Sequence, residues 1–166
     1  RGIANAYTTI LRGIPLATQL MIFYFVVFAP LRLPKLLVAI ISYGLNSGAY
    51  CTEIFRAGIQ GVDKGQTEAA RSLGLNKTQT MLKVVLPQAV KNILPALGNE
   101  FIMIIKETSL ASTFFVGDLM TSYLTVRGAT FLAIESLFIV GVIYFVLTFA
   151  LSKLVGIYEN KLKNAE

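Results

Sequence analysis

Apolar residues are concentrated in four stretches of the chain, which are separated by shorter polar segments. The stretches cover about residues 4–28, 36–55, 81–105 and 131–155, and Arg12 and Gly13 interrupt the first of them. Each is about as long as the ~20 residues that cross a ~30 Å hydrocarbon layer. Backbone amides that face lipid must be paired within their own segment, so such stretches form helices. The pattern predicts an all-α, integral membrane helical bundle with four spans.

The polar segment at the centre of the chain, residues 63–76, is typical of a short capped helix. Asp63 and Gln66 have the spacing of a capping box, and Asn76 and Gln79 repeat that spacing at the start of the next helix. Gly74 suits the left-handed turn that ends a helix. We therefore expect two helices in immediate succession, which make a compact bend.

Small residues occupy the middle of this capped segment. Ala69 and Ala70 lack bulk, and the polar residues Glu68 and Arg71 flank them. A short helix with a small centre can lie in a groove on a partner protein. An ordinary loop between membrane helices can have the same composition, so the residues alone leave both interpretations open.

Composition and charge agree with a membrane protein and indicate its orientation. Hydrophobic residues make up 55% of the 166 residues and charged residues only 14%, well below the ~25% of a soluble domain. With four spans, most basic residues lie on the side of the two chain ends and residues 63–76, whereas the opposite loops hold only Arg32, Lys35 and Arg127. The positive-inside bias places the ends and residues 63–76 in the cytoplasm. The net charge of +6 thus reflects topology, and no basic patch interleaved with aromatic residues indicates nucleic acid as a partner.

Two carboxylates lie within the third apolar stretch, which Pro87 and Pro95 are expected to bend. Glu100 and Glu107 are seven residues apart, close to two helical turns, so both point the same way. A charge at the bilayer centre costs at least ~2.5 kcal/mol and usually faces a bundle interior or an aqueous cavity. The alternative is an interfacial pair matched to nearby lysines.

The second stretch combines close-packing and charged positions. Gly44 and Gly48 have the small-xxx-small spacing that lets another helix approach. Glu53 and Arg56 are three residues apart on one helical face, where an ion pair is expected. Cys51, the single cysteine, is interpreted as a packing residue.

Familiar catalytic motifs are missing from the sequence. The chain has no histidine, so it has neither an HExxH metal site nor a Ser-His-Asp triad, and it has no phosphate-binding loop and no cysteine cluster. An enzyme would have to rely on Glu100 and Glu107. We therefore predict no catalytic residue and no metal ligand on this chain.

The stretch "EAARSLGLNKTQTMLKVVLPQAVKNILPAL" resembles the EAA loop of the membrane subunits of ATP-binding-cassette importers. The flanking segments "RGIPLATQLMIFYF", "SGAYCTEIFRAGIQ" and "GNEFIMIIKETSLAS" are similar to the permeases of the histidine, arginine and glutamine group. The resemblance implies a permease fold of the type I importer, MetI-like kind, over the single domain 1–166, in which the first family helix is expected to be missing upstream. It also implies docking of an ATPase subunit at residues 63–76, through these positions: Glu68, Ala69, Ala70, Arg71 and Gly74.

The same resemblance implies an assembly in the bacterial plasma membrane. A second permease subunit, identical or related, would complete the path, and two ATPase subunits would bind ATP and magnesium. An extracytoplasmic binding protein, or a binding domain fused upstream, would deliver the amino acid. This chain would hold no cofactor of its own.

The resemblance also implies a substrate site on the third and second spans. Its expected members are Glu100, Glu107 and Asn99, with Asn46, Ser47 and Tyr50 as neighbours. Two acids on one face favour arginine, lysine or histidine slightly over glutamine, although Lys106 can neutralise Glu107 instead.

Other function classes remain as alternatives. A stand-alone channel or secondary carrier would use the carboxylates for ion coupling, but it has no need of a capped docking helix. A membrane scaffold would have little reason to keep two stacked carboxylates in a bent helix.

Overall fold

The computed structural model describes residues 2–114 and 116–163, which form helices joined by short turns and contain no strand. The N-terminal part comprises α1 (Gly2–Gly13), α2 (Leu16–Ile22), the π-helical η1 (Phe23–Val27) and the 3-10 turn η2 (Ala29–Leu31). The centre comprises α3 (Lys35–Gln60), α4 (Lys64–Ser72), α5 (Lys77–Thr80), the π-helical η3 (Met81–Val85) and α6 (Leu86–Glu107). The C-terminal part comprises η4 (Thr108–Phe114), α7 (Leu119–Thr130) and α8 (Ala133–Lys163). The all-α prediction is confirmed.

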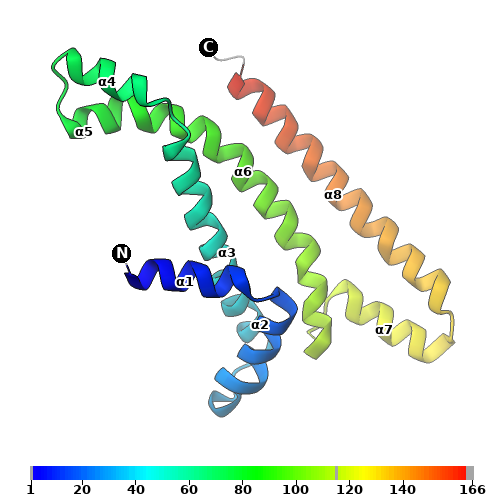
Figure 1. Ribbon diagram of the computed structural model, residues 1–166. Helices are drawn as coiled ribbons and strands as arrows, with labels where there is room; N and C mark the ends of the chain where they lie inside the picture. The colour runs from blue at the N-terminus through cyan, green and yellow to red at the C-terminus, as the bar shows by residue number, and fades with distance from the viewer. Residues whose placement is uncertain (1, 115, 164–166) are drawn as a thin grey trace.

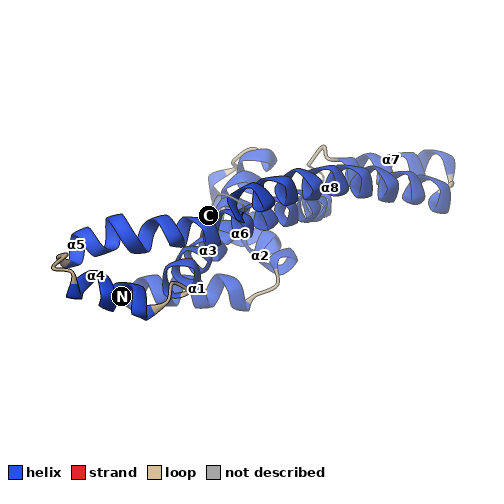
Figure 2. Ribbon diagram, turned by 90° about the horizontal axis from the view of Figure 1, so that it is seen from above, coloured by secondary structure: helices blue, strands red, loops and turns tan. Residues whose placement is uncertain are grey.

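Three long helices form the body of the molecule, with α6 between α3 and α8 and in contact with both. Helices α4 and α5 project at one end, and α7 lies at the other (Figures 1 and 2). Helix α1 crosses α3 near its middle. Since α3 and α6 both run from the projecting end into the body, they connect its two ends.

Two glycines let the long helices pack closely. A Cβ added at Gly58 of α3 would lie 2.3 Å from Ile93 Cγ1 of α6, and one added at Gly98 of α6 would lie 2.8 Å from Val155 Cγ1 of α8. Both distances are shorter than any real carbon contact, so only glycine fits. Such close approach supplies the dispersion contacts that hold membrane helices together. Of the expected pair Gly44 and Gly48, only Gly48 meets another helix, through Tyr7 Oη of α1.

The first apolar stretch is not one straight span, and this part of the prediction is wrong. Helix α1 and the continuous segment Leu16–Val27 meet at a bend of 108°. Pro15 is extended, with φ −55° and ψ 136°, and a proline disfavours helical backbone in the residue before it. The apolar pattern continues through this bend, which is why the pattern alone predicts a single helix.

The last apolar stretch is confirmed as a helix that is long and apolar enough to cross a membrane, over Ala133–Lys161. Among the residues that the structure describes, no other unbroken helix has these properties. The bent pair Gly2–Gly13 plus Leu16–Val27 passes the same test when it is taken as one span. Helices α3 and α6 have 26 and 22 residues, but their polar residues lower their hydropathy. By length and composition, the last stretch and the bent pair therefore pass this test, and the spanning of the membrane by α3 and α6 stays a prediction.

Buried hydrogen bonds hold the bend between α1 and α2. The Gln19 side-chain amide donates to the carbonyl oxygens of Leu11 and, at 2.6 Å, of Ile14. Asn46 Nδ2 of α3 donates to Gln19 Oε1 at 3.0 Å and to Leu11 O at 3.3 Å. These bonds satisfy carbonyl groups that the end of α1 leaves without helical partners. The bend is thus fixed to α3 by polar contacts that exclude water.

Replacing Gly58 by alanine tests the close packing of α3 against α6. We expect Gly58→Ala to lower the free energy of unfolding by about 1–3 kcal/mol because Ile93 must move, and thermal unfolding in detergent measures this. Gly44→Ala on the same helix is the matched control, since its Cβ meets no atom within 4 Å. Equal melting temperatures of the two variants would contradict the close-packing account.

Candidate functional site

The projecting part of the molecule, which we call the arm, consists of α4, α5 and the turns around them, residues 63–80. Asp63 caps α4 by accepting a hydrogen bond from the Gly65 N–H at 2.7 Å. The expected capping box with Gln66 does not form, because the Gln66 side chain lies near Gln88 of α6, at 3.5 Å. The predicted helix itself is confirmed over Lys64–Ser72.

The turn that ends α4 follows the prediction. Gly74 has φ +87°, a left-handed conformation that favours glycine. The capping box between Asn76 and Gln79 forms in both directions, at 2.9 and 3.0 Å. The arm is therefore a rigid hairpin of two short helices.

The two central alanines of the arm face opposite ways. Ala70 is buried, and α4 lies against η3, so its small side chain serves the packing within the arm. Ala69, Glu68 and Arg71 are exposed. Of the expected docking residues, those three are available to a partner protein and Ala70 supports them from inside.

Leu73 is a candidate docking residue that sequence reasoning missed. It is 84% exposed at the tip of the arm, beside Gly74. A large apolar side chain on a rigid polar hairpin is a contact that a partner protein can bury. Its position after Ser72, outside the helical pattern, gave no signal in the sequence.

The arm also overhangs a concave surface of about 840 Å³, where it meets the end of α3. Basic side chains of Lys64, Arg71 and Lys77 line it. Apolar side chains, including Ile59 and Met81, and the polar side chains of Gln60, Thr67 and Thr80 form the rest of its wall. The arm thus has an exposed tip on one side and a basic concave surface on the other.

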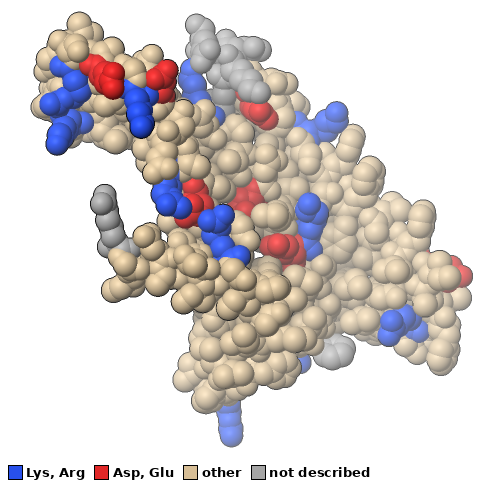
Figure 3. Space-filling model, in the orientation of Figure 1, with Lys and Arg blue, Asp and Glu red and all other residues tan. Residues whose placement is uncertain are grey.

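A second group of functional side chains lies where α1 and α6 meet α3, and we call it the charged face. Side chains of both signs gather in the middle of the surface shown in Figure 3. On α3, Ser47, Tyr50 and Glu53 are spaced by three residues, so they form one stripe along the helix. This stripe contacts α1 at one end and α6 at the other.

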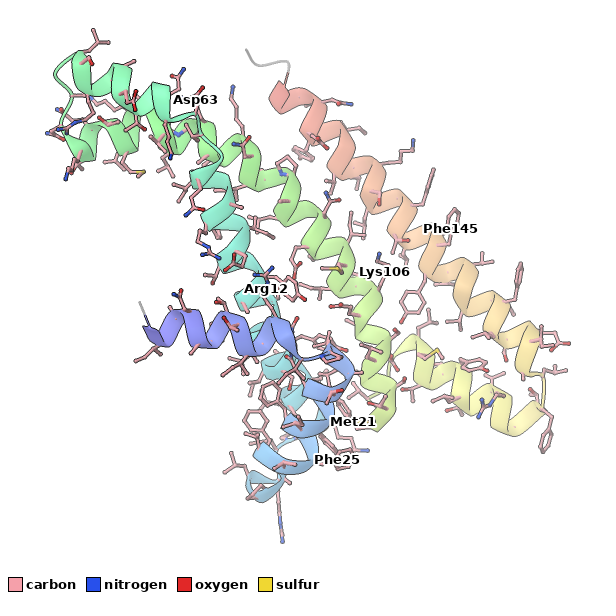
Figure 4. The ribbon with its side chains drawn as sticks, in the orientation of Figure 1. Arg12, Met21, Phe25, Asp63, Lys106 and Phe145 are labelled. Carbon is pink, nitrogen blue, oxygen red and sulfur yellow. The ribbon has the colours of Figure 1, made fainter. Side chains whose placement is uncertain are left out.

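Glu53 carries the ion pairs at the α1 end of the stripe. Its Oε2 lies 3.4 Å from Arg12 Nη1 and also accepts a hydrogen bond from Arg56. The Arg12 guanidinium stands 5.4 Å from the centre of the Tyr50 ring, a cation–π contact. Figure 4 shows Arg12 reaching from the end of α1 over α3. The predicted pair of Glu53 and Arg56 is confirmed, and Arg12 joins it.

Glu100 and Glu107 lie at the α6 end of the stripe. Glu100 is buried, with 6% of its surface exposed, and makes a side-chain hydrogen bond with Ser47. Glu107 is half-buried and interacts electrostatically with Glu100 and Lys106. The two carboxylates therefore share one side of α6, as their spacing predicts.

The structure brings together some of the expected substrate-site residues and separates others. Ser47, Tyr50, Glu100 and Glu107 lie along the charged face. Asn46 is buried in the hydrogen bonds of the bend, whereas Asn99 is exposed on a different side of α6 from Glu100. Sequence reasoning missed Arg12 as a member, because it read this residue only as a topology signal.

Histidine, cysteine, aspartate and glutamate side chains do not gather in groups of three anywhere in residues 2–114 and 116–163, so these residues offer no metal site. The acids of the charged face are instead matched with arginine, lysine and serine. Side chains of both signs in one place can bind a charged or zwitterionic solute.

Comparison with known proteins identifies the family of the chain. The family model described as "binding-protein-dependent transport system inner membrane component" matches residues 1–164. The arginine transport system permease protein ArtQ of Bacillus subtilis is 42% identical over 170 residues, which cover 98% of this chain and 75% of that protein. GlnP of Rickettsia bellii is 41% identical over a segment that covers 96% of this chain and 74% of the GlnP chain. It is named as a glutamine transport system permease protein. A crystal structure of an amino acid ABC transporter with histidines matches with a TM-score of 0.91 and 41% identity, over 96% of this chain and 75% of that one.

Proposed function

The chain belongs to the family of binding-protein-dependent transport system inner membrane components, and from this premise we propose that its charged face binds the substrate while its arm couples to an ATPase. The chain is the membrane permease subunit of an ATP-driven importer for polar amino acids. The single observation that carries the proposed division is that one pair of helices connects the two sites: α3 and α6 carry residues of the charged face and lead into the arm.

The arm is the docking element for the ATPase subunit. The exposed side chains of Glu68, Ala69, Arg71 and Leu73 offer a small centre, two charges and one apolar contact on a rigid hairpin. Closure of the ATPase subunits would push on α4, and the start of α6 would follow. ATP and magnesium would be held by the ATPase subunits, so this chain supplies no catalytic residue and no cofactor site.

The complete importer requires further subunits. A second permease subunit, identical or related, would face the charged surface and close the path, and two ATPase subunits would dock at the two arms. An extracytoplasmic binding protein or a fused binding domain would deliver the amino acid. In this assembly the chain ends and residues 63–76 lie in the cytoplasm, as the basic residues of the arm and the chain ends favour.

Glu100 and Glu107 favour a cationic amino acid as the substrate. Two carboxylates with one neighbouring lysine leave a negative excess at the α6 end of the charged face. Such an excess stabilises a cationic side chain more than a neutral amide. The relatives are named for both arginine and glutamine, so the carboxylates are the feature that favours arginine, lysine or histidine over glutamine.

A stand-alone channel or secondary carrier is the second candidate. It would use Glu100 and Glu107 for ion coupling without ATP. The rigid arm argues against it, because a carrier has no use for a capped hairpin with an exposed docking tip.

Enlarging Ala69 tests the docking role of the arm. Because Ala69 is exposed, Ala69→Trp should leave the fold intact but abolish the fit to the ATPase. ATP-driven amino acid uptake into membrane vesicles should fall about tenfold or more, which corresponds to a loss of about 1.4 kcal/mol or more in the free energy of docking. Ala129→Trp, the same exposed substitution on α7 at the far end of the molecule, is the control. Uptake at the parental rate in Ala69→Trp would refute the docking role.

Neutralising the two carboxylates tests the substrate site. We expect Glu100→Gln and Glu107→Gln to lower radiolabelled arginine uptake by about tenfold or more, because each removes a charge that pairs with the cationic side chain. Glutamine uptake should change much less. Glu135→Gln, an exposed acid at the start of α8, should change neither. If both glutamine variants take up arginine at the rate of the parent protein, the two carboxylates have only a structural role.

A further inference from the structure

The charged face has two poles of opposite sign. At one end, the single carboxylate of Glu53 is shared by the guanidinium groups of Arg12 and Arg56, which leaves one positive charge in excess. At the other end lie the two carboxylates of Glu100 and Glu107 and one lysine, Lys106, which acts on Glu107, so these three side chains carry one negative charge in excess. The face is therefore an extended dipole.

The stripe on α3 joins these poles. Ser47 contacts Glu100, Tyr50 lies under Arg12, and Glu53 holds the arginine pair. Arg12 meets α3 at Tyr50, and Glu107 meets it at Tyr43, whose hydroxyl donates to the Glu107 carbonyl oxygen. Between these two positions the helix rises by about 10 Å, at about 1.5 Å per residue. This separation is comparable with the length of an extended amino acid that has a charged group at each end.

Arg12 is the member of the positive pole that faces the middle of the stripe. Its guanidinium stands over Tyr50, three residues along the stripe from Glu53. Its side chain is 42% exposed and makes only the longer of the two contacts with Glu53, at 3.4 Å. A guanidinium has five N–H donors in a planar fork, so Arg12 has donors left for a second carboxylate.

The surrounding contacts hold Arg12 in place for that purpose. Arg12 is the last residue but one of α1. The bend that follows is fixed to α3 by the hydrogen bonds of Gln19 and Asn46. Arg56 pairs independently with Glu53, so Glu53 keeps a partner when Arg12 turns to another anion.

We propose that Arg12 binds the α-carboxylate of the transported amino acid and thereby orients the substrate, with its carboxylate at Tyr50 and its cationic side chain at Glu100 and Glu107. This assignment rests on the proposed substrate site and adds the group that recognises the part common to all amino acids. A bidentate pair of guanidinium and carboxylate supplies both the charge and the geometry. Arg12 is thus the residue that distinguishes an amino acid from the corresponding amine.

Competition between arginine and agmatine tests the assignment. Agmatine is arginine without its carboxylate, so it keeps every group that Glu100 and Glu107 recognise. Binding of radiolabelled arginine and agmatine is measured on the permease assembled with its ATPase subunits in lipid nanodiscs. The extracytoplasmic binding protein is left out because it would bind arginine itself.

In the parent complex, arginine should bind about tenfold or more tightly than agmatine. Arg12→Gln should remove this preference, because arginine should bind about tenfold more weakly while agmatine binds as before. The retained agmatine binding also shows that the variant is folded. Arg127→Gln, which removes an exposed arginine of α7 outside the charged face, is the matched control and should keep the preference for arginine.

Three results would overturn the assignment. An unchanged preference in Arg12→Gln would show that the carboxylate is bound elsewhere, and equal loss of both ligands would give Arg12 a structural role only. In both cases a loss of arginine binding in Glu107→Gln would leave the proposed substrate site standing. Absence of arginine binding to the parent complex would refute the proposed site itself, and the role of Arg12 with it.

Discussion

The carboxylate of Glu53 is the contact on which the arrangement of the charged face depends. It pairs with Arg56 on its own helix and with Arg12 on α1, and so it ties α1 across α3. Gln19 and Asn46 complete this tie with buried hydrogen bonds at the bend. Polar groups that are withdrawn from water, such as those of Gln19 and Asn46, must find partners, which leaves α1 few alternative positions. The position of α1 brings the Arg12 side chain over the stripe on α3, next to Tyr50 and Glu53.

Helices α3 and α6 connect this face to the arm. Gly58 brings them into close contact through Ile93, between the arm and the stripe that begins at Glu53. Close-packed helices move together because their contacts leave no room to slide independently. In the proposed function, a force on the arm is therefore carried to the residues of the charged face. The proposal thus assigns coupling and recognition to one pair of helices and the arm between them.

Local signals in the sequence predicted the helix ends and the turn of the arm, whereas long-range contacts determine the bend at Pro15 and the position of Arg12. Capping residues and a glycine define helix ends through their nearest neighbours, so Asn76, Gln79 and Gly74 behave as their spacing indicates. The same holds for Glu100 and Glu107, whose spacing fixes a common side of α6. The bend at Pro15 could not be predicted from the hydrophobic pattern, because the helical segments on both sides of it are apolar. The contacts that fix the bend join residues up to 35 positions apart. Likewise, Arg12 meets Glu53 only once that bend has formed, and the pattern gave no sign that Ala70 would face inward.

In the proposed importer, the stripe on α3 borders a water-filled path whose access changes with the state of the ATPase. A cysteine at Ser47, in a Cys51→Ser background, tests it through the rate of modification by a membrane-impermeant thiol reagent in the assembled importer. The account predicts that this cysteine reacts, and that its rate differs between the nucleotide-free and ATP-bound states. A cysteine at Phe138, which is 72% exposed on the apolar α8, should stay unreactive in both states. If the cysteine at Ser47 is as protected as the one at Phe138 in every state, the charged face does not border the transport path.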